Sequence, residues 1–108
     1  MRKRPAPILS TRADDPELRD EIDRFVIGLA ERVDAVQDAL CAGDLPKLAE
    51  LCGSLRGDAD RFGYSLLAEA AAATAVAAES DAPAEAENGV VEITQIGQRI
   101  RLGHRGAA

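Results

Sequence analysis

The sequence predicts an all-α protein, an antiparallel up-down four-helix bundle preceded by an extended N-terminal segment. Apolar residues recur at spacings of three and four along most of the chain, which is the pattern of helices with one buried face. One tyrosine and two phenylalanines are the aromatic residues of a 108-residue chain, so the core must be aliphatic, and this composition favours helices over a β-sandwich. Helices joined by short turns pack as antiparallel neighbours.

We expect residues 1–13 to be extended, because Pro5 and Pro7 lie among basic residues there, with Ile8 and Leu9 packing on the domain end. Asp15 followed by Pro16 is a helix start, with a capping carboxylate and a proline in the first turn. An apolar stripe then continues to Ala42, where Gly43 ends the helix. The stripe consists of Leu18, Ile22, Phe25, Val26, Leu29, Val33, Val36 and Leu40.

Asp44 is expected to cap a second helix, which tolerates Pro46 in its first turn and ends at Gly63. Ser65 is expected to cap a third helix over 66–80, whose many alanines combine high helix propensity with little bulk. Small side chains imply that neighbouring helices approach the third helix closely.

Residues 81–83 form a predicted linker to the last segment, 85–103. Its β-branched residues favour a strand, but Ile93, Ile96 and Ile100 keep helical spacing, so we predict a helix that is irregular near Asn88-Gly89. The domain is expected to cover residues 14–102, and residues 103–108 are expected to fray.

The composition and net charge argue against several classes of partner and cofactor. A net charge of −6 argues against a nucleic-acid partner, whose phosphates require clustered Lys and Arg. The basic start of the chain has no apolar stretch after it, and no segment is long enough to span a bilayer, so we expect a cytoplasmic protein without a membrane partner. Two cysteines and one histidine make neither a disulfide framework nor a zinc site, and no metal or cofactor is expected.

Two glycines interrupt the second helix on the side opposite its apolar stripe. Projected at 100° per residue, Gly53 and Gly57 lie with Glu50 and Asp60, where water should be. The apolar stripe consists of Leu45, Leu48, Cys52, Leu55, Ala59 and Phe62. Each interior glycine costs a helix about 1 kcal/mol relative to alanine. Packing inside a bundle does not explain outward glycines, so we infer that another molecule approaches this backbone closely.

The same segment resembles the centre of a histidine phosphotransfer (Hpt) domain. That family's core motif runs A-H-x-L-K-G, followed by a small residue and, six positions after the first glycine, by a second one. Here the matching string is Cys52-Gly53-Ser54-Leu55-Arg56-Gly57, followed by Ala59 and Gly63. The resemblance extends over roughly residues 8 to 80, with Gly53 at the position of the phospho-accepting histidine and Arg56 at that of the lysine.

The resemblance implies an Hpt-type bundle in two-component phosphorelay signalling that has lost its phosphate carrier. Glycine has no nucleophilic side chain, so the family's reaction is not expected at position 53. Arg56 would lie one turn further on and offer a cation to a receiver's acidic pocket, while Gly57 keeps the surface low. Asp58 and Asp60 stand where the family more often has small neutral residues, which makes the site less suited to phosphate.

No other residue is expected to replace the histidine. Ser54 points about 100° away from position 53 and has no base nearby. Cys52 and Cys41 lie on apolar stripes and are expected to be buried. His104 lies in the tail, where we expect it to be solvated.

We therefore predict a protein that is not an enzyme and that docks a receiver domain or a histidine kinase. The predicted contact residues are Glu50, Gly53, Ser54, Arg56, Gly57 and Asp60. The alternative is a structural bundle without a signalling role that self-associates as a homodimer through the Gly53-x-x-x-Gly57 face. A dimer formed through this face would leave no room there for a receiver.

Overall fold

The computed structural model describes residues 6–106, and these residues form four helices and no strand. The helices are α1 (Arg19–Cys41), α2 (Leu45–Arg61), α3 (Ser65–Glu79) and α4 (Pro83–Gly106). The prediction of an all-helical chain with four helices is therefore confirmed. None of these helices combines the length and the apolar character that crossing a membrane would require.

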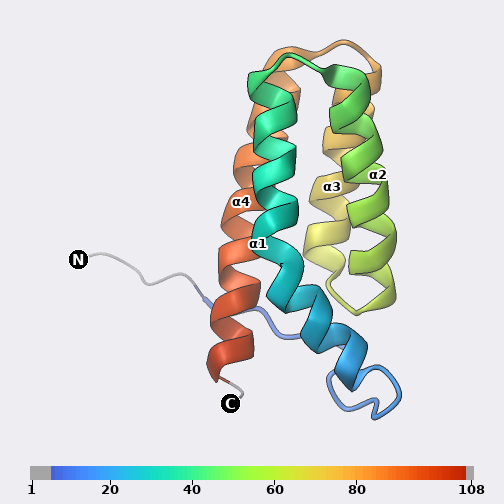
Figure 1. The fold of residues 1–108 in the computed structure, drawn as a ribbon, viewed down its shortest axis with the longest axis vertical. Coiled ribbons are helices and arrows are strands. Elements are labelled where there is room, and N and C mark those ends of the chain that lie inside the picture. The colour runs from blue at the N-terminus through green and yellow to red at the C-terminus, as the bar shows by residue number, and fades with distance from the viewer. Residues whose placement is uncertain (1–5, 107–108) are drawn as a thin grey trace, which may run out of the picture.

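The connections alternate between the two ends of the molecule (Figure 1). The α1–α2 and α3–α4 connections lie at one end, and the α2–α3 turn lies at the other. α3 packs against both α2 and α4, and α1 packs against the same two helices. α2 and α4 are thus placed diagonally, and each keeps an outward face.

The core is aliphatic, as predicted, and every helix contributes to it. The largest fully buried aliphatic side chains are Leu29, Leu48, Leu55, Leu67, Ile93, Ile100 and Val36. α3 supplies mainly alanine, and α4 approaches it so closely that a Cβ on Gly89 would lie 3.0 Å from the Cβ of buried Thr74. The expectation that small side chains on the third helix allow close approach is confirmed.

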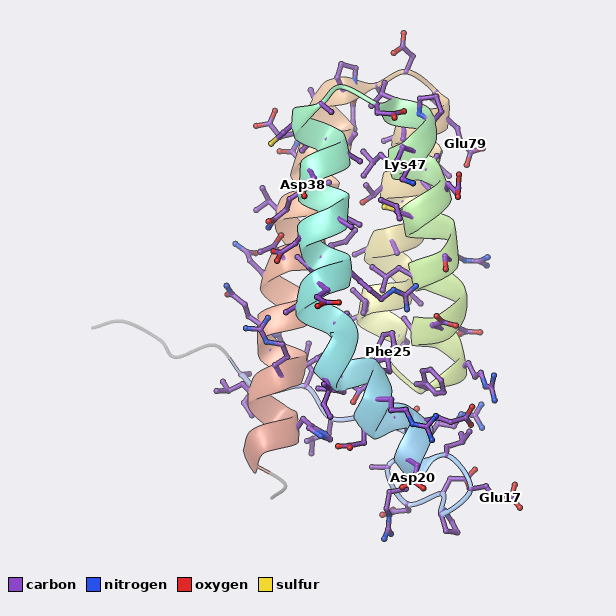
Figure 2. The ribbon with its side chains drawn as sticks, viewed as in Figure 1. Glu17, Asp20, Phe25, Asp38, Lys47 and Glu79 are labelled. Atoms are coloured by element: carbon purple, nitrogen blue, oxygen red, sulfur yellow. The ribbon has the colours of Figure 1, made fainter. Side chains whose placement is uncertain are left out.

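The three aromatic rings gather near the α2–α3 turn. Phe25 lies near that end of α2 (Figure 2), with ring-centroid distances of 5.3 Å to Phe62 and 5.8 Å to Tyr64. All three residues are buried. This small cluster closes the end of the core beside which the N-terminal segment runs.

The predicted turn signals between α1, α2 and α3 are confirmed. Gly43 and Gly63 have φ values of +70° and +81°, in the left-handed region that glycine adopts without strain. The Asp44 side chain accepts a hydrogen bond of 3.1 Å from the Lys47 backbone N–H, and Pro46 lies in the first turn of α2. Ser65, in contrast, is the first residue of α3 and makes no side-chain capping bond.

The first helix begins later than predicted, at Arg19 rather than near Pro16. Asp15 Oδ1 accepts a hydrogen bond of 2.9 Å from Glu17 N, and Asp15 O accepts one from Leu18 N. These bonds hold residues 16–18 in a turn. Short polar side chains such as that of Asp15 commonly bond nearby backbone groups in this way and so compete with helix formation.

α4 is more regular and longer than predicted. It passes without a break through Asn88-Gly89, so the predicted irregularity there is wrong, and it continues to Gly106, past the expected end of the domain at residue 102. Gly103 is buried against the backbone of Ile8, which gives this last part of the helix a packing partner. Residues 107–108 lie outside the described residues.

Residues 6–14 form a strap across the end of the bundle. Residues 6–10 have no regular structure, and residues 11–14 form a turn, so the predicted extended segment ends before Thr11. Residues 1–5 of that segment lie outside the described residues. Ile8 N donates to Arg99 O at 3.0 Å, and Thr11 N donates to Gly63 O at 3.0 Å. Ile8 packs on the core as predicted, while Leu9 remains largely exposed.

Candidate functional site

The candidate site is the outward side of α2, which we call the α2 outward face. It consists of Glu50, Gly53, Ser54, Arg56, Gly57 and Asp60. All six residues are exposed, and Gly53 stands at the midpoint of the 17-residue helix. The opposite side of α2 is buried through Leu48, Cys52 and Leu55, so the predicted division of the helix into two faces is confirmed.

Open space lies above both glycines of this face. A Cβ added at Gly53 or at Gly57 would have no neighbouring atom within 4 Å. Alanine would fit at either position, so intramolecular packing does not require glycine there. The bare backbone forms a low area at the centre of the face.

The edge of the face toward α1 is tied to that helix by Arg32. Arg32 Nη1 lies 2.8 Å from Asp58 Oδ2, and Arg32 Nη2 donates a hydrogen bond of 3.1 Å to Ser54 Oγ. The guanidinium also lies 5.8 Å from the centre of the Phe25 ring. Ser54 Oγ therefore accepts a hydrogen bond from a cation, and among the described residues no hydrogen bond joins it to a carboxylate that could act as a base.

Sequence reasoning did not identify Arg32. Its position one residue before the apolar stripe residue Val33 places it on the flank of α1, but nothing in the sequence states which helix that flank meets. Next to it, a shallow hollow of about 300 Å³ between α1 and α2 is lined by residues that include Arg24, Gly28 and Asp58. This hollow extends the α2 outward face onto α1.

Arg56 lies on the flank of the face away from α1. Since it follows Gly53 by three residues, it projects about 60° around the helix from Gly53, whereas Ser54 projects about 100° the other way. Among the residues that the structure describes, Arg56 is exposed and forms no ion pair, unlike Arg61, whose Nη2 lies 3.1 Å from Glu21 Oε1. Its guanidinium is thus available to an acidic group of a partner.

The two cysteines and the histidine, which are the other candidate nucleophiles, differ in burial and in their partners. Cys52 is buried as predicted, and desolvation raises the pKa of its thiol to about 11, so it is protonated at neutral pH. Cys41 is exposed, and its predicted burial is wrong because it is the last residue of α1, beyond which no helix covers it. His104 is not free in a solvated tail: its Nε2 lies 2.7 Å from Asp23 Oδ1.

Within the described part of the chain, no group of three or more His, Cys, Asp and Glu side chains is arranged to hold a metal ion. Comparison of the chain with protein-family models, with curated proteins and with solved structures finds no match. The geometry of the α2 outward face is therefore the basis for a functional assignment.

Proposed function

We propose that this protein is an Hpt-like module of two-component phosphorelay signalling that docks a receiver domain or a histidine kinase without carrying phosphate itself. The arrangement proposed is an antiparallel up-down bundle in the cytoplasm, with the α2 outward face as the docking surface. It acts as a binding protein and not as an enzyme.

The observation that carries the proposal is the bare backbone at the centre of α2 beside Arg56, a cation that forms no ion pair among the described residues. Two glycines at which an added Cβ would meet no atom within 4 Å let a partner surface approach closely, and exposed Arg56 adds a cation one turn away. A receiver domain accepts phosphate on an aspartate in an acidic pocket, which is the complement of such a cation. An arginine can bind a carboxylate or a phosphoryl group through two parallel hydrogen bonds.

Neither the outward face nor the buried side of α2 offers a nucleophile for phosphoryl transfer, which supports docking as the function. Gly53 has no nucleophile, Ser54 is bound to Arg32, and Cys52 is buried with a protonated thiol. The module would compete with an active phosphotransfer protein or hold a receiver in one state. If it holds a receiver in one state, the shift in the receiver's equilibrium is set by the module's difference in affinity for the two receiver states.

The decisive experiment measures binding to receiver domains from the same organism, each free and carrying a mimic of aspartyl phosphate. The test variant is Arg56→Glu, and the matched control is Arg19→Glu, the same charge reversal at an exposed position of α1. We expect saturable binding that Arg56→Glu weakens by at least about tenfold, the equivalent of 1.4 kcal/mol, while the control binds like the parent. Absence of binding to every receiver, or equal loss in both variants, contradicts the proposal.

A second experiment tests the inferred lineage. Gly53→His introduces an imidazole at the exposed midpoint of α2, one turn from Arg56, where a ring nitrogen is nucleophilic near neutral pH. We expect the variant to accept label from a phosphorylated receiver that the parent binds but does not dephosphorylate. A variant that binds the same receiver and remains unlabelled would show that the face lacks the phosphotransfer geometry.

A further inference from the structure

The exposed side of α4 carries a stripe of uncharged residues, which we call the α4 stripe. It consists of Ala84, Asn88, Val91, Gln95, Gln98 and Leu102, all exposed and spaced four, three, four, three and four residues apart. Val91 and Leu102 remain 51% and 44% exposed. This spacing is typical of a seam along which two helices pack.

Charges flank the α4 stripe on both sides, and their sign changes along the helix. One flank carries Glu85, Glu92 and Arg99 at intervals of seven residues, and the other carries Glu87 and Arg101, with uncharged Thr94 midway between them. Both flanks are acidic in the N-terminal half of α4 and basic in its C-terminal half. The residues beside the stripe are therefore negatively charged at one end of α4 and positively charged at the other.

The surface beside the stripe leaves room for a second helix. A groove of about 760 Å³ lies between α1 and α4, and another of about 430 Å³ lies between α3 and α4. Val91 lines both grooves, and Leu66 of α3, 47% exposed, adds an apolar wall to the second. A helix lying along the α4 stripe would cover both grooves and these exposed apolar side chains.

We propose that the α4 stripe binds the α4 stripe of a second copy of this chain, with the two helices antiparallel and a two-fold axis near Gln95. This orientation places Glu92 beside the partner's Arg99 and Glu87 near the partner's Arg101, and symmetry makes each pair occur twice. A parallel orientation would place like charges together. The occupant is a second copy because the flanks of the stripe carry both the acidic and the basic residues that such an interface pairs.

The inference is independent of the docking function. α4 lies diagonally from α2 in the bundle, so a dimer formed through α4 leaves both α2 outward faces free (Figure 1). It also differs from self-association through Gly53 and Gly57, which would cover those faces. Such a dimer would present two docking faces on opposite sides.

Sedimentation velocity of the full chain over a wide concentration range tests the interface. Glu92→Arg is the first variant, because Glu92 is exposed and makes no side-chain hydrogen bond or ion pair among the described residues. It converts two opposite-charge pairs into two like-charge pairs, and we expect the dimer Kd to rise about tenfold. Arg99→Glu should act in the same direction.

The double variant Glu92→Arg/Arg99→Glu restores both pairs with their signs exchanged, and we expect it to recover the parent Kd. Glu50→Arg, the same charge reversal on the α2 outward face, is the matched control and should leave dimerisation unchanged. Arg99 Nε also donates to Ala6 O in the strap, so Val91→Glu provides an independent disruption of the stripe. A parent that remains monomeric, an unaffected Glu92→Arg variant, or dissociation by Glu50→Arg would overturn the proposal.

Discussion

Interior glycines occur in α1, α2 and α4, and those of α2 and α4 have opposite surroundings. In α4, a Cβ on Gly89 would overlap Thr74 Oγ1, and a Cβ on Gly103 would overlap the carbonyl oxygen of Ile8. In α2, a Cβ on Gly53 or Gly57 would meet no atom within 4 Å. The α4 glycines are explained by packing within the chain, whereas those of α2 lower helix propensity without an internal benefit. Because packing within the chain does not explain Gly53 and Gly57, a contact with another molecule is the best explanation for glycine at these two positions.

The largest expected effect is that of Gly89→Ala. The new methyl group would lie against the side chain of Thr74, which is fully buried and whose hydroxyl donates a hydrogen bond of 2.7 Å to Ala70 O. α3 and α4 must separate, and we expect a loss of about 1–3 kcal/mol in the free energy of unfolding, measured with urea.

A double-mutant cycle with Thr74→Gly identifies the cause of that loss. Removing the Thr74 side chain should make Gly89→Ala much less costly in the double variant than in the parent. Additive losses would show that the two helices do not meet at this crossing.

Gly103→Ala should have a smaller effect, because the clash is with the strap and not with the core. The new Cβ would lie 3.0 Å from the carbonyl carbon of Ile8. Releasing the strap at this point breaks the hydrogen bond from Ile8 N to Arg99 O and exposes Ile8, which limits the loss to about 1–2 kcal/mol. Amide hydrogen exchange should show faster exchange at Ile8 with little change at the core of α2. Equal acceleration in both places would mean that the strap and the bundle unfold together.

Gly53→Ala and Gly57→Ala should change stability in the opposite direction. Each adds helix propensity in open space, and we expect each to stabilise the fold by about 0.5–1 kcal/mol in urea unfolding. Each variant should also bind a receiver more weakly, because the added methyl group raises the low centre of the face. Gly28→Ala in α1, where an added Cβ would also meet no atom within 4 Å, is the control for the gain in helix propensity in the unfolding measurement. A destabilised Gly53→Ala variant would show that α2 is packed differently.

Much of the fold could be predicted because its signals are local. The left-handed turns at Gly43 and Gly63 and the Asp44 cap depend on residues adjacent in sequence, and the outward position of Gly53 follows from helical geometry alone. The strap and the true end of α4 could not be predicted, because they depend on contacts such as that of Arg99 with Ala6, 93 residues apart. Arg32 was missed for the same reason, since its partners Ser54 and Asp58 belong to another helix.

The smallest expected effect at neutral pH concerns Cys52, and it tests the orientation of α2 on which the comparison of glycines depends. Because Cys52 precedes Gly53, a rotation of α2 that covered the glycines would expose the thiol. We expect a thiol reagent to modify exposed Cys41 in the native protein and Cys52 only after unfolding. Rapid modification of both cysteines would mean that the bare patch is not outward.

The pH dependence of stability gives an independent measure of the same burial. Burial raises the pKa of the Cys52 thiol to about 11 from 9.0, so the folded state binds its proton more tightly than the unfolded state does. The resulting stability is fully present below pH 9.0 and is lost as pH rises toward 11. Burial also raises the pKa of Tyr64, which adds a decrease of the same sign at alkaline pH. Unfolding free energies of the parent and of Cys52→Ala should therefore converge between pH 9.0 and 11, and a constant difference across that range would show that Cys52 is solvated.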